Sequence, residues 1–218
     1  ILVGNLMALR QRQVKRLLAY SSIAQVGYML LGFGFSMSYG LMDGATGGFF
    51  HLITHSMMKG LAFLAAGALF YALHIARENH SPLTVDDLNG ASRKYPLVAF
   101  ALSAALLGLG GLPPFAGFMS KWQILVAGVE TQNTVMTIIV IFAALNSVLS
   151  LGYYAPLVNR MYRRETSGAV ENGESIPWLM IVPLVILTLA IVVIGVWPSS
   201  MDFVIQNASY SLLYTFFN

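Results

Sequence analysis

Long apolar stretches separated by short polar segments make up most of the chain. A transmembrane helix takes about 20 apolar residues, whereas membrane β-strands are segments of about 10 residues that alternate in polarity. The apolar stretches here are continuous, so we predict an all-α, polytopic bundle of transmembrane helices. The predicted helices cover residues 17–39, 45–75, 96–112, 114–130, 134–158 and 177–197.

The polar segments divide this pattern into units. Ile1–Leu9 is apolar but too short to span a membrane, and we interpret it as the end of a helix that begins outside the chain. On this interpretation the sequence is the C-terminal portion of a longer protein. The predicted organisation is the end of that helix with a basic loop (1–16), a five-helix unit (17–158), a polar loop (159–176), a final transmembrane helix (177–197) and an interfacial tail (198–218).

The two most basic loops, residues 10–16 and 160–164, pose a problem of orientation. Five predicted helices separate them, so they should face opposite sides of the membrane, although basic loops normally stay on one side. Either one loop breaks this rule or one segment does not cross simply. Phe115–Val129 is the segment in question, because it is short, follows Pro113-Pro114 and contains a lysine. A discontinuous helix there fits the rule that irregular backbone at membrane depth is buried in protein or lines a cavity.

Composition excludes several classes of protein. Apolar residues make up 57% of the chain and charged residues 10%, against roughly 45–50% and about 25% in soluble domains. Twelve Lys and Arg against nine Asp and Glu give a net charge of +3, which is too small and too scattered for a nucleic-acid surface. The chain has no Cys, which excludes disulfides, thiolate metal sites and iron–sulfur ligation within it. A P-loop and a dinucleotide-binding glycine motif are also absent from the sequence.

His51, His55 and Lys59 are the sharpest candidate site. Their spacing of i, i+4 and i+8 places them along one stripe of a helix, about 12 Å long. Each histidine could instead bond a neighbouring helix, with Lys59 extending towards the interface. Metal or haem binding is disfavoured, because no carboxylate or thiol lies nearby in the sequence and Lys59 would repel a cation. A proton relay fits best, since imidazole titrates near neutral pH and intramembrane ionisable groups face a bundle interior or a wet cavity.

Lys121 is the second candidate, because it follows a glycine-rich segment and the Pro113-Pro114 pair. Prolines free backbone carbonyls, and a lysine beside a helix break can exchange its proton with water or with another lysine. The alternative is a lysine that snorkels from a helix end. Asn146, Ser150 and the pair Tyr153-Tyr154 could add hydrogen-bonded links, although polar contacts between helices explain them equally well. The candidate proton-transfer residues are thus Lys59, Lys121, His55 and His51, and we expect no metal- or cofactor-binding residue in this chain.

Three stretches resemble one known family: Lys15–Tyr28 (KRLLAYSSIAQVGY), Phe50–Phe63 (FHLITHSMMKGLAF) and Gly111–Leu125 (GLPPFAGFMSKWQIL). They are similar to the antiporter-like proton-conducting subunits of complex I-type respiratory complexes. These include subunits N, M and L of NADH:quinone oxidoreductase and relatives in F(420)H(2) dehydrogenase and in multisubunit Mrp antiporters. The resemblance implies the C-terminal half of such a subunit, built as the second of two inverted repeats, with Lys59 as the central lysine, His51 and His55 as its partners, and Lys121 on the discontinuous helix towards the outer exit.

The resemblance also implies a function. The chain would be a proton-translocating membrane subunit of a redox-driven, complex I-like NADH or F(420)H(2):quinone oxidoreductase in the cytoplasmic (inner) membrane. It would carry out no redox chemistry itself, because iron–sulfur clusters, flavin and quinone would belong to partner subunits. Its partners would be other membrane subunits, a hydrophilic redox arm and the lipid bilayer, and not a nucleic acid. The alternatives are a subunit of a multisubunit Na⁺/H⁺ antiporter and a passive membrane scaffold.

Overall fold

The computed structural model describes residues 1–78 and 81–217, and within them it is built from helices, apart from an isolated β-bridge between Gln13 and Thr84. In an apolar surrounding, helices satisfy their own backbone groups, which is why continuous apolar stretches adopt them. The prediction of an all-α bundle is confirmed. The helices are α1 (Leu2–Leu9), α2 (Val14–Tyr39), α3 (Met42–Leu73), η1 (Ile75–Arg77), α4 (Ala91–Lys94), α5 (Pro96–Gly110), α6 (Ala116–Glu130), α7 (Thr134–Met161), α8 (Gly168–Glu171), α9 (Trp178–Val196), η2 (Pro198–Met201) and α10 (Asp202–Phe217).

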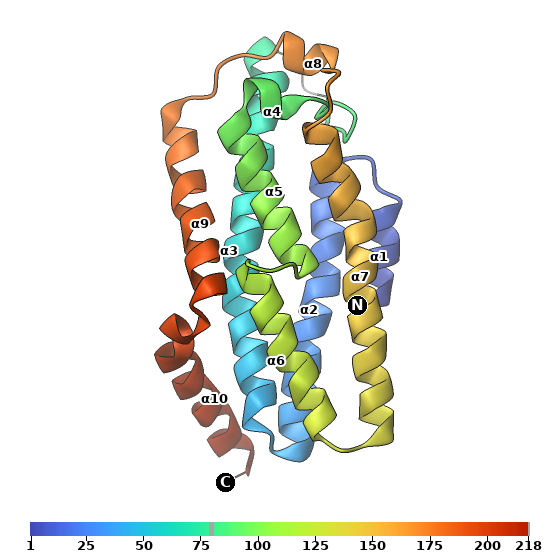
Figure 1. Ribbon diagram of the computed structural model, residues 1–218, viewed down its shortest axis with the longest axis vertical. Coiled ribbons are helices and arrows are strands. Elements are labelled where there is room, and N and C mark those ends of the chain that lie inside the picture. The colour runs from blue at the N-terminus through green and yellow to red at the C-terminus, as the bar shows by residue number, and fades with distance from the viewer. Residues whose placement is uncertain (79–80, 218) are drawn as a thin grey trace.

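Helix α3 lies in the middle of the bundle, with α2, the α5–α6 pair and α9 around it (Figure 1). Within the described residues, α2, α3, α7 and α9 are long and apolar enough to cross a membrane. Glycines bring α2 and α3 together, because a Cβ atom added to Gly32 would lie 2.8 Å from the carbonyl oxygen of Gly44. This close approach buries the polar face of α2 against α3.

Helices α5 and α6 are two halves of one discontinuous helix. Each has 15 residues and is therefore about 22 Å long, which is less than the roughly 30 Å of a bilayer's apolar core. Figure 1 shows α6 continuing from the end of α5, so that the pair together follows α3. Gly111 ends α5 with a φ of 83°, a left-handed conformation that glycine adopts without strain, and Pro113 and Pro114 separate the halves. The expected discontinuity is confirmed, and only the two segments together match the length of a crossing.

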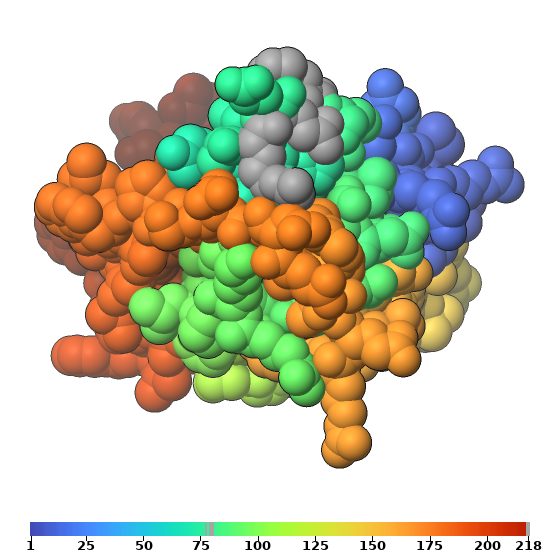
Figure 2. All heavy atoms as spheres, turned by 90° about the horizontal axis from the view of Figure 1, so that it is seen from above, coloured from blue at the N-terminus to red at the C-terminus, as the bar shows by residue number. Residues whose placement is uncertain are grey.

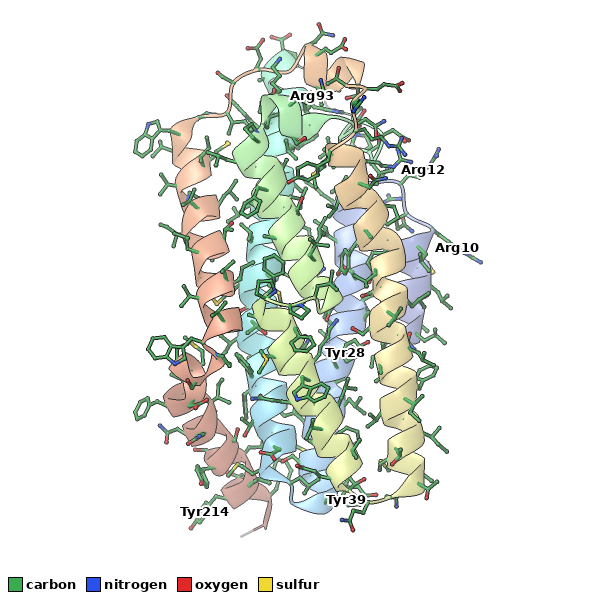
Figure 3. The ribbon with its side chains drawn as sticks, viewed as in Figure 1. Arg10, Arg12, Tyr28, Tyr39, Arg93 and Tyr214 are labelled. Atoms are coloured by element: carbon green, nitrogen blue, oxygen red, sulfur yellow. The ribbon has the colours of Figure 1, made fainter. Side chains whose placement is uncertain are left out.

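This arrangement brings the two basic loops to the same end of the bundle. Asp86 bonds Arg160 from the loop after α7 and lies 3.9 Å from Arg12 in the loop before α2. The orientation problem seen in the sequence is thereby resolved, because α5 and α6 count as one passage. We call this the basic end, formed by residues 10–16, 91–94 and 160–164; Figure 3 labels Arg10, Arg12 and Arg93 there.

Charge is distributed very unevenly along the bundle. Every Lys and Arg other than Lys59 and Lys121 falls in the basic end or in η1. Figure 2 looks down on this end, where the N-terminal segment lies at one edge and α9 at the opposite one. The other end, at the turns before α3 and after α6, carries Asp43 and Glu130.

Several helix boundaries differ by a few residues from the sequence-based prediction, and the start of α3 has a clear physical reason. Helix α3 begins at Met42, before the start of the predicted helix 45–75, and Asp43 in its first turn interacts favourably with the positive helix N-terminus. The turn before α3 uses Gly40, which ends α2 with a φ of 69°. Residues 202–217 of the tail form α10, which packs against α3. Its interfacial position in a bilayer stays a prediction.

Candidate functional site

Helix α3 carries His51, His55 and Lys59 on a single face, as their spacing predicts. His51 is fully buried and Lys59 retains 6% exposure, whereas His55 is half-buried. The two imidazole rings follow each other with centroids 6.1 Å apart. Lys121, on α6, is 4% exposed. All four residues predicted from the sequence therefore lie inside the bundle or on its inner face.

Lys59 is held by α2. Its Nζ donates to the carbonyl oxygen of Leu18 at 2.7 Å and to the hydroxyl of Ser21, which is fully buried. The Ser21 hydroxyl itself donates to the same Leu18 carbonyl at 2.8 Å. The ammonium group thus has two neutral oxygen acceptors.

Lys121 is held at the break between α5 and α6. Its Nζ donates to the carbonyl oxygen of Leu109 at 2.7 Å and to the hydroxyl of Ser147 on α7 at 3.1 Å. It also lies 4.9 Å from the centroid of the Tyr28 ring, in cation–π geometry. Tyr28 is labelled in Figure 3, about midway along the bundle.

The prolines explain why these carbonyls are available. In a continuous helix the carbonyl of Leu109 would accept from the N–H of residue 113, and that of Gly110 from residue 114. Both positions are proline, which has no N–H. The freed Leu109 carbonyl accepts from Lys121, and the freed Gly110 carbonyl accepts from Ser147 at 3.2 Å. The end of α5 at Gly111, followed by Pro113-Pro114, therefore leaves free the acceptors that a buried lysine needs.

His51 reaches the same carbonyl through Gln25. The Gln25 side chain donates from Nε2 to the Leu109 oxygen at 2.9 Å, and its Oε1 lies 3.1 Å from Nε2 of His51. Because Oε1 can only accept, His51 carries its proton on Nε2, and its Nδ1 accepts from the hydroxyl of Ser120 at 2.8 Å. His51 and Lys121 are thus joined through a single shared acceptor.

His55 is placed between the two lysine sites but bonds neither of them. Its Nε2 is buried and has no hydrogen-bond partner among the described residues. The structure therefore brings His51 and Lys121 into one network, while His55 and Lys59 remain neighbours of that network on the face of α3. The Nε2 atom of His55 can donate a hydrogen bond to a water molecule or accept one from it, depending on the tautomer.

Neither buried lysine has a counter-ion within the described chain. The ion pairs there lie near the basic end, between Asp86 and Arg12, between Asp86 and Arg160, and between His74 and Asp87. Lys59 and Lys121 meet neutral acceptors instead, so a change in the protonation of either lysine does not require an ion pair to break. Among the described residues there is also no cluster of three or more His, Asp or Glu side chains that could hold a metal ion.

Sequence reasoning missed several members of this network. Ser21, Gln25 and Tyr28 were not among the predicted site residues, although their spacing of i, i+4 and i+7 places them on one face of a helix. That periodicity is a signal that could have identified them. For Ser120 the signal is its position next to Lys121, whereas nothing in the local sequence marks Ser147.

Comparisons with known proteins agree with this architecture. A model of the family described as "NADH:quinone oxidoreductase/Mrp antiporter, TM" matches residues 1–149. F(420)H(2) dehydrogenase subunit N of Methanosarcina mazei is 35% identical over 197 residues, which cover 89% of this chain and 38% of the relative. NADH-quinone oxidoreductase subunit N 2 of Sorangium cellulosum is 37% identical over 210 residues, which cover 95% of this chain and 39% of the relative. The chain thus spans about two fifths of the length of these relatives.

Solved structures show the same fold. A chain of respiratory complex I from Thermus thermophilus with bound aureothin superposes with a TM-score of 0.72 and 31% identity, over 92% of this chain and 42% of that one. A chain of the archaeal membrane-bound sulfane sulfur reductase gives 0.78 and 31%, over 96% and 39%. A chain of the Mrp complex from Dietzia sp. gives 0.83 over 97% and 45%, but its 22% identity shows likeness of fold alone. The chain is a multi-pass membrane protein that belongs to the NADH:quinone oxidoreductase/Mrp antiporter transmembrane family.

Proposed function

We propose that this chain is part of a proton-translocating membrane subunit in a redox-driven complex related to NADH-quinone oxidoreductase and F(420)H(2) dehydrogenase. The observation that carries the proposal is the shared carbonyl of Leu109, at which Lys121 and the Gln25 partner of His51 meet. The names of the relatives, which are subunits N of both kinds of complex, support the redox-driven reading.

In this proposal the residues divide into those that carry protons and those that hold them. An amide side chain and a backbone carbonyl do not relay a proton readily, so Gln25 and Leu109 position His51 and Lys121. Hydroxyls both donate and accept, and those of Ser120 and Ser147 contact His51 and Lys121 respectively. Protons would pass between the titratable groups through these hydroxyls and bridging water.

The two lysines would be coupled by charge. Both ammonium groups lie in the interior of one bundle, where Coulomb repulsion is stronger than in water, and neither has a carboxylate to offset it. Arrival of a proton at one site therefore favours release at the other. Charge changes in neighbouring subunits would drive this exchange.

The wider assembly follows from the same proposal. The chain would sit in the cytoplasmic membrane, as the second of two inverted repeats, with its basic end facing the cytoplasm as the positive-inside rule requires. Its partners would be other membrane subunits and a hydrophilic arm. Iron–sulfur clusters, flavin and the quinone site would belong to those partners.

The test replaces Lys121 by Ala in the complete complex, reconstituted in sealed vesicles. Proton translocation and electron transfer are measured together, and we expect fewer protons per electron. The control is Lys94→Ala, which removes the same side chain at the exposed basic end, where its Nζ bonds the carbonyl of Glu171. Undiminished pumping in Lys121→Ala and Lys59→Met variants would contradict the proposal and favour a passive scaffold.

A second candidate is a subunit of a sodium/proton antiporter without a redox partner. The description of the family names the Mrp antiporter, and the fold matches the Mrp complex over 97% of this chain. Vesicles energised by a pH gradient, with no electron donor present, separate the two. Collapse of the pH gradient on addition of Na⁺ favours the antiporter. A pH gradient that does not change on addition of Na⁺ favours the redox-driven pump.

A further inference from the structure

A polar cavity opens at the basic end beside α7. Its volume is about 340 Å³, and its lining includes Arg10, Arg12, Arg160 and, deeper along α7, Gly152, Tyr153 and Pro156. Pro156 has no N–H, so the carbonyl of Gly152 lacks the donor that a regular helix would supply. The cavity therefore combines charged side chains at its mouth with a helix segment that has a spare acceptor.

Tyr153 connects this cavity to the interior. It lines the cavity, yet only 5% of it is exposed, and its hydroxyl donates to Oδ1 of Asn5 on α1 at 2.8 Å. Its ring packs against that of Tyr154, with centroids 4.4 Å apart and an interplanar angle of 63°. Tyr154 is fully buried.

The hydroxyl of Tyr154 has an unusual environment. It is buried and makes no hydrogen bond of regular geometry among the described residues, although the side chains of Ser21, Gln25 and Tyr153 lie near enough to interact with it. Buried hydroxyls almost always have a partner, supplied by protein or by water. Ser21 holds Lys59, and Gln25 holds His51. The Tyr154 hydroxyl therefore lies between the cavity and both lysine networks.

We infer that this cavity, with Tyr153 and Tyr154 at its inner end, is the water inlet that delivers protons from the basic end to Lys59 and Lys121. Water filling the cavity reaches Tyr153, and water at Tyr154 bridges its hydroxyl to Ser21 or Gln25. A phenol relays by accepting a proton on its oxygen as its own proton leaves to the next oxygen, so the tyrosine is unchanged after each transfer. The inference rests on the proposed proton-translocating function.

The first test is Tyr154→Phe in the complete complex. The substitution removes one oxygen that makes no hydrogen bond of regular geometry among the described residues, so the fold and assembly should be unchanged. We expect most of the proton translocation to be lost, with the complex intact on a native gel. The matched control is Tyr162→Phe at the exposed end of α7, which should pump normally. Normal pumping by Tyr154→Phe overturns the role of this hydroxyl.

The second test blocks the cavity from outside. The chain has no cysteine, so Gln11→Cys, at the cavity lining, can be modified by a bulky thiol reagent. Modification should stop proton uptake, whereas the same reagent should leave uptake intact in Ser175→Cys, which lines a separate cavity near the basic end. The unsubstituted complex treated with the reagent controls for partner cysteines.

The outcomes separate the inlet from the function itself. If Lys121→Ala abolishes pumping while the modified Gln11→Cys and Tyr154→Phe complexes pump normally, the inlet is wrong and the proposed function stands. If Lys121→Ala pumps normally, the proposed function is wrong, and the inlet, which rests on it, is wrong as well. Inhibition in all three variants, with both controls active, supports the inlet.

Discussion

Pro113 stands four residues after Leu109 and cannot donate to its carbonyl, which accepts instead from the side chains of Lys121 and Gln25. A helix break inside a membrane usually needs other groups to satisfy the freed backbone. Here the freed carbonyl accepts from Lys121, which is titratable, and from Gln25, which contacts the titratable His51. The break and the buried lysine therefore depend on each other.

Pro113→Ala tests this dependence directly. If α5 extends past Gly111 in this variant, the alanine N–H bonds the Leu109 carbonyl, a hydrogen bond worth about 0.5–1.5 kcal/mol, and competes with Lys121 and Gln25. We expect a lower ratio of protons to electrons in vesicles, with assembly retained. Pro183→Ala within α9 is the control, because it also restores a donor inside a helix but far along the chain from this network. Equal ratios in the two variants would argue against competition for the carbonyl.

Gln25→Met should separate His51 from the shared carbonyl. Methionine keeps the length of the side chain but cannot bridge Nε2 of His51 to Leu109, and loss of a buried bridging group costs about 1–3 kcal/mol. We expect impaired proton translocation and a complex that dissociates at lower temperature. Gln206→Met, on the exposed face of α10, controls for the substitution itself. If translocation is normal in Gln25→Met, the glutamine does not position His51.

The titratable residues of the site were predictable, whereas the residues that hold them were mostly not. Lys59 and Lys121 are conspicuous because charge inside a membrane is costly, and Pro113-Pro114 marks the discontinuity. Gln25, by contrast, bonds a main-chain carbonyl 84 residues away. A single polar residue in a helix does not indicate which distant group it bonds. The path of α6 along α3 also depends on packing between distant segments. The sequence alone therefore did not show that the two basic loops lie at the same end of the bundle.

Gly117 should tolerate no side chain, because α6 begins in direct contact with the end of α5. A Cβ atom there would lie 2.0 Å from the carbonyl oxygen of Gly108, so backbone must move. We expect Gly117→Ala to destabilise the complex by about 1–3 kcal/mol, as overpacking does.

Gly34→Ala on α2 provides the matched comparison for Gly117→Ala. A Cβ atom at Gly34 meets nothing within 4 Å, and alanine within a helix gains about 0.5–1 kcal/mol over glycine. Heating the purified complexes and following the intact band on native gels measures both. Destabilisation by Gly34→Ala as large as that by Gly117→Ala would contradict the packing argument.

The orientation of the bundle can be determined by labelling, because the chain has no cysteine of its own. Glu165→Cys, in the loop after α7, lies on the side of the basic end. Glu130→Cys is at the last residue of α6, on the opposite side. In sealed vesicles with the cytoplasmic face outward, a membrane-impermeant maleimide should label the first variant and reach the second only after detergent is added. Mass spectrometry of peptides from this chain distinguishes the label from reaction with partner subunits. The reverse pattern would mean that the basic end, which contains nine Lys and Arg residues, faces the outer side, against the positive-inside rule. Protons delivered by the cavity at the basic end would then come from the outer side of the membrane.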